Sequence, residues 1–222
     1  MDKSYSVERG VKNMTVYLYS GTPGSGKSLH VVKDIRDKLV RGGNVIANFP
    51  INLDNIKPRK NKKLGIFKYV DNDDLTVQYL FNFYKKYHVK GKEKQTLLVI
   101  DECQTKFDPR DFRDKSRKSF NRFFSLHRKL GFNVILVSQN DRLVDRQIRC
   151  NIEYNVIHRK VNNYKFGRFI PFPVFIAIEY WYGAKLKCNS NMFFYNKKLG
   201  SLYDTFMIFN EKDLSQLENN IL

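Results

Sequence analysis

The chain has 222 residues and a formal net charge of +18, with 40 lysines and arginines against 22 acidic residues. A chain of this length can bury one sizeable core with an appendage, but not two full domains. Its three cysteines are odd in number and widely spaced, which argues against a disulfide framework or a zinc site. The positive charge predicts attraction to polyanions, either nucleic acid or an anionic membrane surface, without choosing between them.

The first elements along the chain are an apolar strand, a glycine-rich loop and a helix. Residues 14–19 read as a strand, and apolar residues recur at helical spacing from 29 to 40. The loop between them has the pattern that lets backbone N–H groups surround the phosphates of a nucleotide. Lys27 would reach the β- and γ-phosphates, and Ser28 would hold Mg²⁺. The residues expected to bind ATP are Gly21, Thr22, Pro23, Gly24, Ser25, Gly26, Lys27, Ser28 and Leu29.

The next segments supply ordinary α/β elements. Residues 44–49 predict a strand, and residues 73–88 predict a helix. The side chain that caps this helix is expected to be one of Asp71, Asn72 and Asp73.

Two carboxylates then follow a continuous apolar strand at residues 96–100. A buried strand that ends in paired acids is typical of nucleotide hydrolases. Asp101 is expected to hold Mg²⁺ through its water shell. Glu102, one residue further on, is expected to face the other way and polarise the attacking water.

A third strand is predicted at residues 133–140, after a helix at 113–130. In that helix three phenylalanines are interpreted as core, namely Phe120, Phe123 and Phe124. Gln139 ends the strand and is placed to sense the γ-phosphate, because the carboxyl ends of parallel strands meet at one ligand crevice. The short helical stretch that follows carries three arginines, Arg142, Arg146 and Arg149, any of which could act as an arginine finger in a neighbouring subunit.

The sequences GTPGSGKS, LLVIDE and VILVSQ, followed by the arginine stretch, resemble those of the Zot family, and the resemblance covers roughly residues 14–160. Zot-type proteins are assembly ATPases of filamentous bacteriophages, and the strand that ends in glutamine also resembles the HerA and FtsK translocases. The resemblance implies a hexamer-forming ATPase that drives extrusion of phage particles across the host membrane. It also implies that Glu102 is the catalytic acid, Gln139 the sensor, and an arginine such as Arg149 the finger.

The expected fold class is therefore α/β, a P-loop NTPase three-layer sandwich with a mostly parallel sheet and a small C-terminal β-rich subdomain. The expected division is an ATPase core at 1–160, a β-rich extension at 161–209 and a polar tail at 210–222. The most apolar stretch, residues 170–181, is too short for a membrane-spanning helix, which needs about 20 residues. The chain is thus expected to be soluble in the cytoplasm, at the cytoplasmic face of the host inner membrane.

Three functional classes remain open from the sequence. The favoured one is a phage-assembly ATPase whose partners would be further copies of itself, membrane-embedded assembly or coat proteins, and single-stranded DNA. A DNA translocase or packaging ATPase could use the same core and the same basic residues at 57–63 and 110–129. A small-molecule kinase is disfavoured, because a kinase has less use for a water-polarising acid at Glu102.

Overall fold

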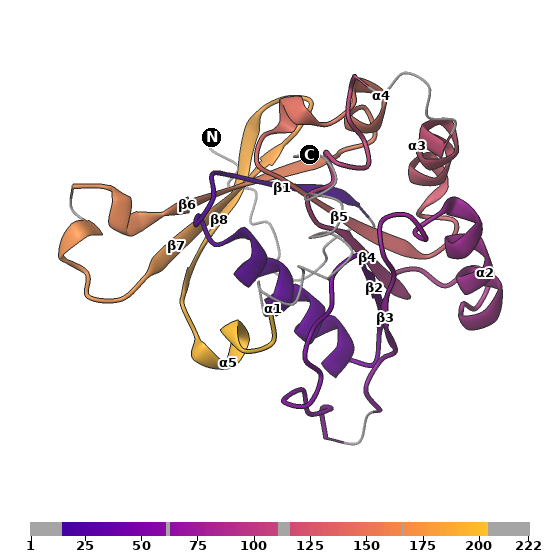
Figure 1. The fold of residues 1–222 in the computed structure, drawn as a ribbon, viewed down its shortest axis with the longest axis horizontal. Helices are drawn as coiled ribbons and strands as arrows, with labels where there is room; N and C mark the ends of the chain where they lie inside the picture. Colours follow the sequence, from indigo (N-terminus) through magenta and orange to yellow (C-terminus); the bar gives the residue numbers. More distant parts are fainter. Residues whose placement is uncertain (1–14, 61–62, 111–115, 166, 204–222) are drawn as a thin grey trace, which may run out of the picture.

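One mixed β-sheet runs through the part of the chain that this computed structural model describes, residues 15–60, 63–110, 116–165 and 167–203 (Figure 1). The strand order is β3-β2-β4-β5-β1-β6-β7-β8. The strands are β1 (Val16–Ser20), β2 (Asn44–Ala47), β3 (Phe67–Tyr69), β4 (Thr96–Ile100), β5 (Phe132–Ser138), β6 (Tyr154–Lys160), β7 (Val174–Trp181) and β8 (Leu186–Phe194). Neighbours from β3 to β6 pair in parallel, whereas β7 and β8 pair antiparallel. The mostly parallel sheet is thus confirmed.

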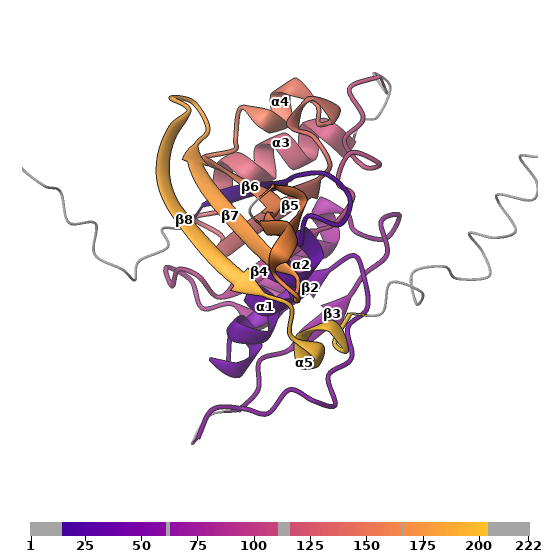
Figure 2. The ribbon, with the colours of Figure 1, turned by 90° about the vertical axis from the view of Figure 1, so that its left-hand side faces the viewer.

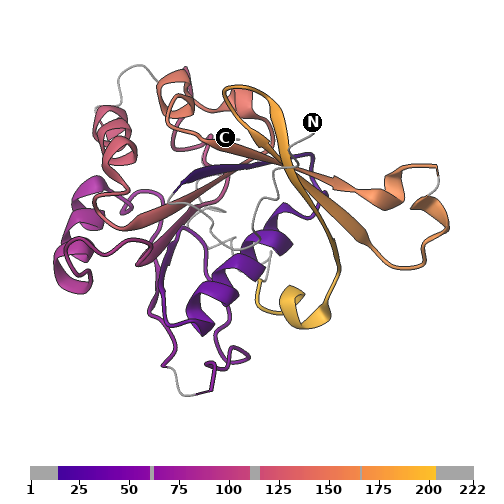
Figure 3. The same cartoon turned by 180° about the vertical axis from the view of Figure 1, so that it is seen from behind.

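Helices cover both faces of this sheet and make three layers (Figures 1 and 3). The helices are α1 (Lys27–Val40), α2 (Val77–Tyr87), α3 (Ser116–Leu126), α4 (Arg146–Arg149) and α5 (Lys197–Gly200), with 3₁₀ turns at Asp141–Leu143, Val161–Asn163 and Gly167–Phe169. Alternate residues of β1 serve opposite cores, because side chains of a strand point to alternate faces. Leu18 packs on the side of α2, α3 and α4, and Tyr19 packs on the side of α1 and α5.

The second helix begins later than the sequence predicts, so the expected caps are wrong. The side chain of Thr76 is the cap, since its Oγ1 accepts a hydrogen bond from the Tyr79 N–H at 3.1 Å. Asp71 instead accepts from the N–H of Asn72 at 2.6 Å and shapes the turn before the helix. Such local side-chain bonds compete with helix formation.

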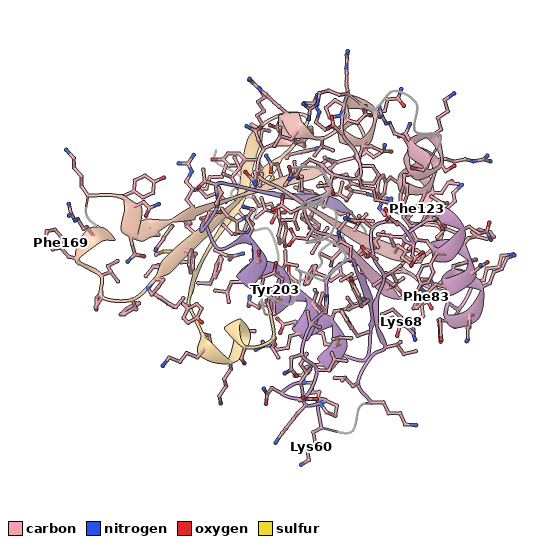
Figure 4. All side chains as sticks on the ribbon, viewed as in Figure 1. Lys60, Lys68, Phe83, Phe123, Phe169 and Tyr203 are labelled. Atoms are coloured by element: carbon pink, nitrogen blue, oxygen red, sulfur yellow. The ribbon has the colours of Figure 1, made fainter. Side chains whose placement is uncertain are left out.

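The phenylalanines of α3 form core, as the sequence predicts. Phe120, Phe123 and Phe124 are all buried, and Figure 4 shows Phe123 directed toward the sheet, near Phe83 of α2. The helix ends at Leu126, earlier than expected, and the chain turns through Gly131, whose φ of 76° favours glycine. Residues 113–115, also expected to be helical, lie outside the described residues.

The C-terminal β-structure continues the central sheet. β7 pairs with β6 over seven residue pairs, and β8 pairs with β7 at the open edge (Figure 2). The connection between β6 and β7 projects away from the helices, and Phe169 lies at its tip (Figure 4). The expected boundary between an ATPase core and a β-rich extension, after residue 160, coincides with the end of β6. The division into these two parts stays a prediction. The tail at 210–222 lies outside the described residues.

Candidate nucleotide-binding site

The glycine-rich loop joins β1 to α1 at the carboxyl edge of the parallel strands. Gly24 and Gly26 have φ values of 72° and 90°, in the left-handed region that glycine adopts without strain. Nζ of Lys27 donates hydrogen bonds to the carbonyl oxygens of Gly21 at 2.7 Å and Thr22 at 3.1 Å. The lysine amine is therefore held against the carbonyl groups of its own loop, and its contact with phosphates stays a prediction.

Two of the glycines are also required because the loop packs closely on β6 and β7. A Cβ at Gly21 would lie 2.5 Å from the carbonyl oxygen of His158, and a Cβ at Gly26 would lie 2.6 Å from Cδ1 of Phe175. A Cβ atom makes no non-bonded contact this short in real structures, so a larger residue at either position would require the loop, β6 or the Phe175 side chain to move. The phosphate loop thus packs directly against β6 and β7.

Two histidines to which the sequence assigns no role lie together behind the loop. Nδ1 of His30, on α1, is 2.8 Å from Nε2 of His158, on β6, and both residues are buried. Burial, and then the charge of His30, lower the pKa of His158 to about 3, so this ring is neutral at pH 7. Its Nδ1 lies 3.3 Å from the carbonyl oxygen of Ser20, the last residue of β1. The pair ties α1 and β6 to the strand end where the loop begins.

The acidic end of β4 is fixed by Asn48, which follows the neighbouring strand β2. The Asn48 amide accepts from the Asp101 N–H at 2.6 Å and donates to the Asp101 carbonyl at 2.8 Å. Burial raises the pKa of the Asp101 carboxyl to about 6, although the Glu102 N–H and the charge of Lys27 oppose the shift. Asp101 is therefore a largely buried acid whose charged form would be stabilised by a nearby cation.

Asp101→Asn is expected to stabilise the nucleotide-free protein at pH 7.5 by up to about 3 kcal/mol, the equivalent of two pKa units. Because burial raises the folded-state pKa, Asp101 destabilises the fold only in its charged form. This cost to the free energy of unfolding is absent below pH 3.8, grows as pH rises and is complete above about pH 6. The gain from the substitution should therefore shrink toward zero between pH 6 and pH 4. Urea unfolding at several pH values measures it, with the exposed Asp54→Asn as control. A loss of stability at pH 7.5 would contradict the assignment.

Glu102 does not have the strand backbone from which the sequence predicts its orientation. The expectation that it faces away from Asp101 assumes strand geometry, but β4 ends at Ile100 and Glu102 has a φ of 44°. A left-handed residue breaks the alternation of a strand. Burial lowers the pKa of Lys27, and the charges of Glu102 and Asp101 both act against this shift. Both acids are therefore near enough to Lys27 for their charges to act on its amine, although Glu102 is exposed. The Glu102 carboxylate also accepts a hydrogen bond from the Gln104 amide.

The third predicted strand brings Gln139 beside the loop. Gln139 follows the last residue of β5, and its carbonyl oxygen accepts a hydrogen bond from the Gly21 N–H at 3.3 Å. Its side chain is exposed. The arginines lie further along the chain, where Arg149 is half-buried and near enough to Tyr182 of its own chain to lower the pKa of that phenol. The other two, Arg142 and Arg146, are exposed.

The residues of this site fit a nucleotide and its Mg²⁺. The buried Ser25 Oγ has no hydrogen-bond partner among the described residues, which suits a phosphate oxygen as acceptor. A Cβ at Gly24 would meet nothing within 4 Å, so this part of the loop is open. No side chain caps the N-terminus of α1, whose N–H groups are therefore available to an anion. The Ser28 hydroxyl and the Asp101 carboxylate are oxygen ligands of the kind that Mg²⁺ prefers.

Sequence reasoning missed three residues of the site. Asn48 could have been noticed, because it follows a parallel strand at the same sheet edge as Asp101. His158 and Tyr203 have no such signal, since only the tertiary fold brings β6 and the C-terminal segment to the loop. The Tyr203 hydroxyl lies 3.4 Å from Oδ2 of Asp101.

Comparison with known proteins finds relatives of this chain both in sequence and in structure. The "Gene 1 protein" of Enterobacteria phage f1 is 33% identical over 147 residues, which are 65% of this chain and 42% of that protein. The chain thus matches less than half the length of this relative. Among solved structures, a DnaB-like replicative helicase has a TM-score of 0.56 at 14% identity, covering 84% of this chain and 56% of that one. The DNA-packaging ATPase B204 from Sulfolobus Turreted Icosahedral Virus has a TM-score of 0.51 at 15% identity, covering 82% and 98%.

These structural likenesses show that the fold is that of a P-loop NTPase. A family model described as zonular occludens toxin (Zot) matches residues 15–174 and thus takes in the glycine-rich loop, the paired acids and the arginine stretch. Because this match spans well over half of the chain, the chain belongs to the Zot family.

Proposed function

We propose that the chain is an ATP-hydrolysing motor that drives the assembly and extrusion of a filamentous phage through the membrane of its host. The observation that carries the proposal is that Lys27, Asp101 and Glu102 lie together at the carboxyl edge of the parallel strands, near enough for the charges of both carboxylates to act on the pKa of the lysine amine. A lysine that binds phosphates beside a metal-binding acid and a second acid is the arrangement that hydrolysis of a terminal phosphate requires. Membership of the Zot family supports phage assembly as the use of that energy.

Each residue of the crevice has a proposed role. Lys27 and the N–H groups of the loop bind the phosphates of ATP. Ser28 and Asp101 would hold Mg²⁺, which supplies positive charge against the charge that develops on the phosphate oxygens. Glu102 accepts a proton from the attacking water, and Gln139 contacts the γ-phosphate side of the site.

Further copies of the chain are proposed to complete the site, as a ring that would be a hexamer by resemblance to its family. The sequence favours Arg149 as the finger that enters a neighbouring site. Arg146 is better placed to do so, because its side chain is exposed while Arg149 is half-buried beside Tyr182 of the same chain. We therefore propose Arg146 as the first candidate and keep Arg149 as the second.

The proposed location is the cytoplasmic face of the host inner membrane, with membrane-embedded phage proteins and single-stranded DNA as partners. No helix in the described ranges has the length and apolar character to cross a bilayer. The basic segment around Lys60 is exposed and lies at the lower end of the molecule in Figure 4. Its backbone contacts the end of α1, where the Arg59 N–H donates to the Val40 carbonyl. A polyanion would therefore meet the chain away from the nucleotide crevice.

The test of the proposed function is particle release by a phage whose copy of this chain carries Lys27→Ala. Release is expected to fall at least about a hundredfold, because the loss of one phosphate-binding charge removes nucleotide binding, while coat protein and single-stranded DNA accumulate inside the host. Undiminished release would refute the motor role. The alternative, a DNA translocase, predicts that DNA stimulates the purified ATPase and that this stimulation disappears between 50 and 200 mM salt.

A further inference from the structure

The C-terminal segment of the described chain reaches into the magnesium side of the crevice. The Tyr203 hydroxyl lies 3.4 Å from Oδ2 of Asp101 and is near enough to the Ser28 hydroxyl for that group to lower the pKa of the phenol. Ser28 and Asp101 are the two residues assigned to Mg²⁺, one from the phosphate loop and one from the end of β4. A single phenol thus lies beside both proposed metal ligands.

The ring of Tyr203 is held in place by a wall that belongs to the site itself. It packs edge-on against Phe49, with 5.3 Å between ring centroids and 86° between planes. Phe49 is buried and directly follows Asn48, whose amide binds the backbone of Asp101. Figure 4 shows Tyr203 beside α1, near the middle of the molecule.

The backbone before Tyr203 is also docked. The buried side chain of Leu202 belongs to the same core as α1, and its carbonyl accepts a hydrogen bond from the Asn52 N–H at 2.9 Å. Burial, and then the charge of Asp101, raise the pKa of Tyr203 to about 12, so the group is a neutral phenol at pH 7. A neutral hydroxyl cannot balance the charge of Asp101 as a divalent cation does.

We propose that Tyr203 is a gate on the metal side of the nucleotide site, whose hydroxyl must leave Ser28 and Asp101 before Mg²⁺–ATP can bind there. The proposal rests on the proposed nucleotide-binding function. Mg²⁺ needs its ligands and waters in near-octahedral geometry at about 2.1 Å from the ion. A phenol beside Ser28 and Oδ2 of Asp101 takes up space that the ion or its waters would need. The hydrogen bond to Asp101 is long and therefore weak, as suits a contact that has to break.

Tyr203→Phe tests the gate, because it removes the hydroxyl and keeps the ring against Phe49. The variant is expected to bind ATP in Mg²⁺ about three- to tenfold more tightly than the wild type, the equivalent of one or two ordinary hydrogen bonds lost from the nucleotide-free state. Binding of ATP in EDTA should not change. Tyr195→Phe is the matched control, because it removes a hydroxyl from the same segment away from Ser28 and Asp101. Equilibrium binding of a fluorescent ATP analogue gives both affinities without any turnover.

Three results would overturn the gate, and they differ in what else they affect. Equal Mg²⁺–ATP affinity in Tyr203→Phe and wild type would leave the nucleotide site intact and refute only the gate. Weaker binding by the variant would show that the hydroxyl supports the metal instead of opposing it. A wild type that binds ATP in neither buffer would refute the proposed function together with the gate.

Discussion

Glu102→Gln is expected to bind Mg²⁺–ATP as tightly as the wild type and to hydrolyse it about 10²- to 10⁴-fold more slowly, the usual contribution of a general base. The substitution keeps the size and hydrogen-bonding capacity of the side chain, including its bond with Gln104, but removes the group that accepts a proton. Phosphate release under saturating ATP measures turnover, and the fluorescence of a bound ATP analogue measures affinity. Both assays are made on the same preparation.

Gln104→Ala is the matched control for this prediction. It removes the hydrogen bond to the Glu102 carboxylate while leaving the carboxylate itself in the crevice. Its turnover should fall far less than that of Glu102→Gln. If Glu102→Gln turns over at the wild-type rate, the catalytic assignment fails. Asp101 would then be the remaining acid beside Lys27.

Arg146→Ala is expected to reduce hydrolysis by the assembled protein by about 10³-fold or more, the magnitude of an arginine finger supplied in trans. Nucleotide affinity should remain close to that of the wild type, because this arginine lies outside its own crevice. Mixing the variant with Lys27→Ala subunits should restore activity. The mixed ring combines an intact nucleotide site in one subunit with an intact arginine in the next.

Arg149→Ala separates the two candidate fingers. Since Arg149 is half-buried beside Tyr182 of its own chain, its loss should lower the free energy of unfolding through lost packing. Mixing this variant with Lys27→Ala subunits should not restore activity. Complementation by Arg149→Ala and none by Arg146→Ala would reverse the assignment. If neither variant regains activity on mixing, the trans mechanism itself fails.

The sequence was sufficient for those features that depend on local pattern and on parallel-strand topology. The loop motif, the strand before Asp101 and the strand before Gln139 each have their own periodicity, and parallel pairing brings their ends to one edge. The ends of helices were harder to predict, because several side chains compete to bond the backbone there. Thr76 caps α2, whereas Asp71 bonds within the preceding turn. The stabilities of alternative caps differ by only about 1 kcal/mol, so a sequence pattern hardly decides between them.

Contacts between distant parts of the chain could not be predicted in the same way. Gly26 is required partly by Phe175, which lies 149 positions later and reaches the loop only because β7 joins the sheet beside β6. The left-handed backbone of Glu102 likewise lies in the turn after β4 and takes this residue out of the alternation of the strand. Tyr203 reaches Asp101 through the docking of Leu202, which no motif indicates.

Helix α1 has the phosphate loop at its first turn and the basic segment at its last, a separation of about 21 Å for 14 residues. This exceeds two screening lengths at physiological ionic strength, which are about 8 Å each. A nucleic acid or lipid headgroup bound at the last turn of α1 would therefore hardly change the electrostatic potential at the phosphate loop. Any coupling between the bound polyanion and the bound nucleotide therefore has to be mechanical, through α1 as a rigid helix. Raising the salt concentration should release the polyanion without weakening the binding of the nucleotide.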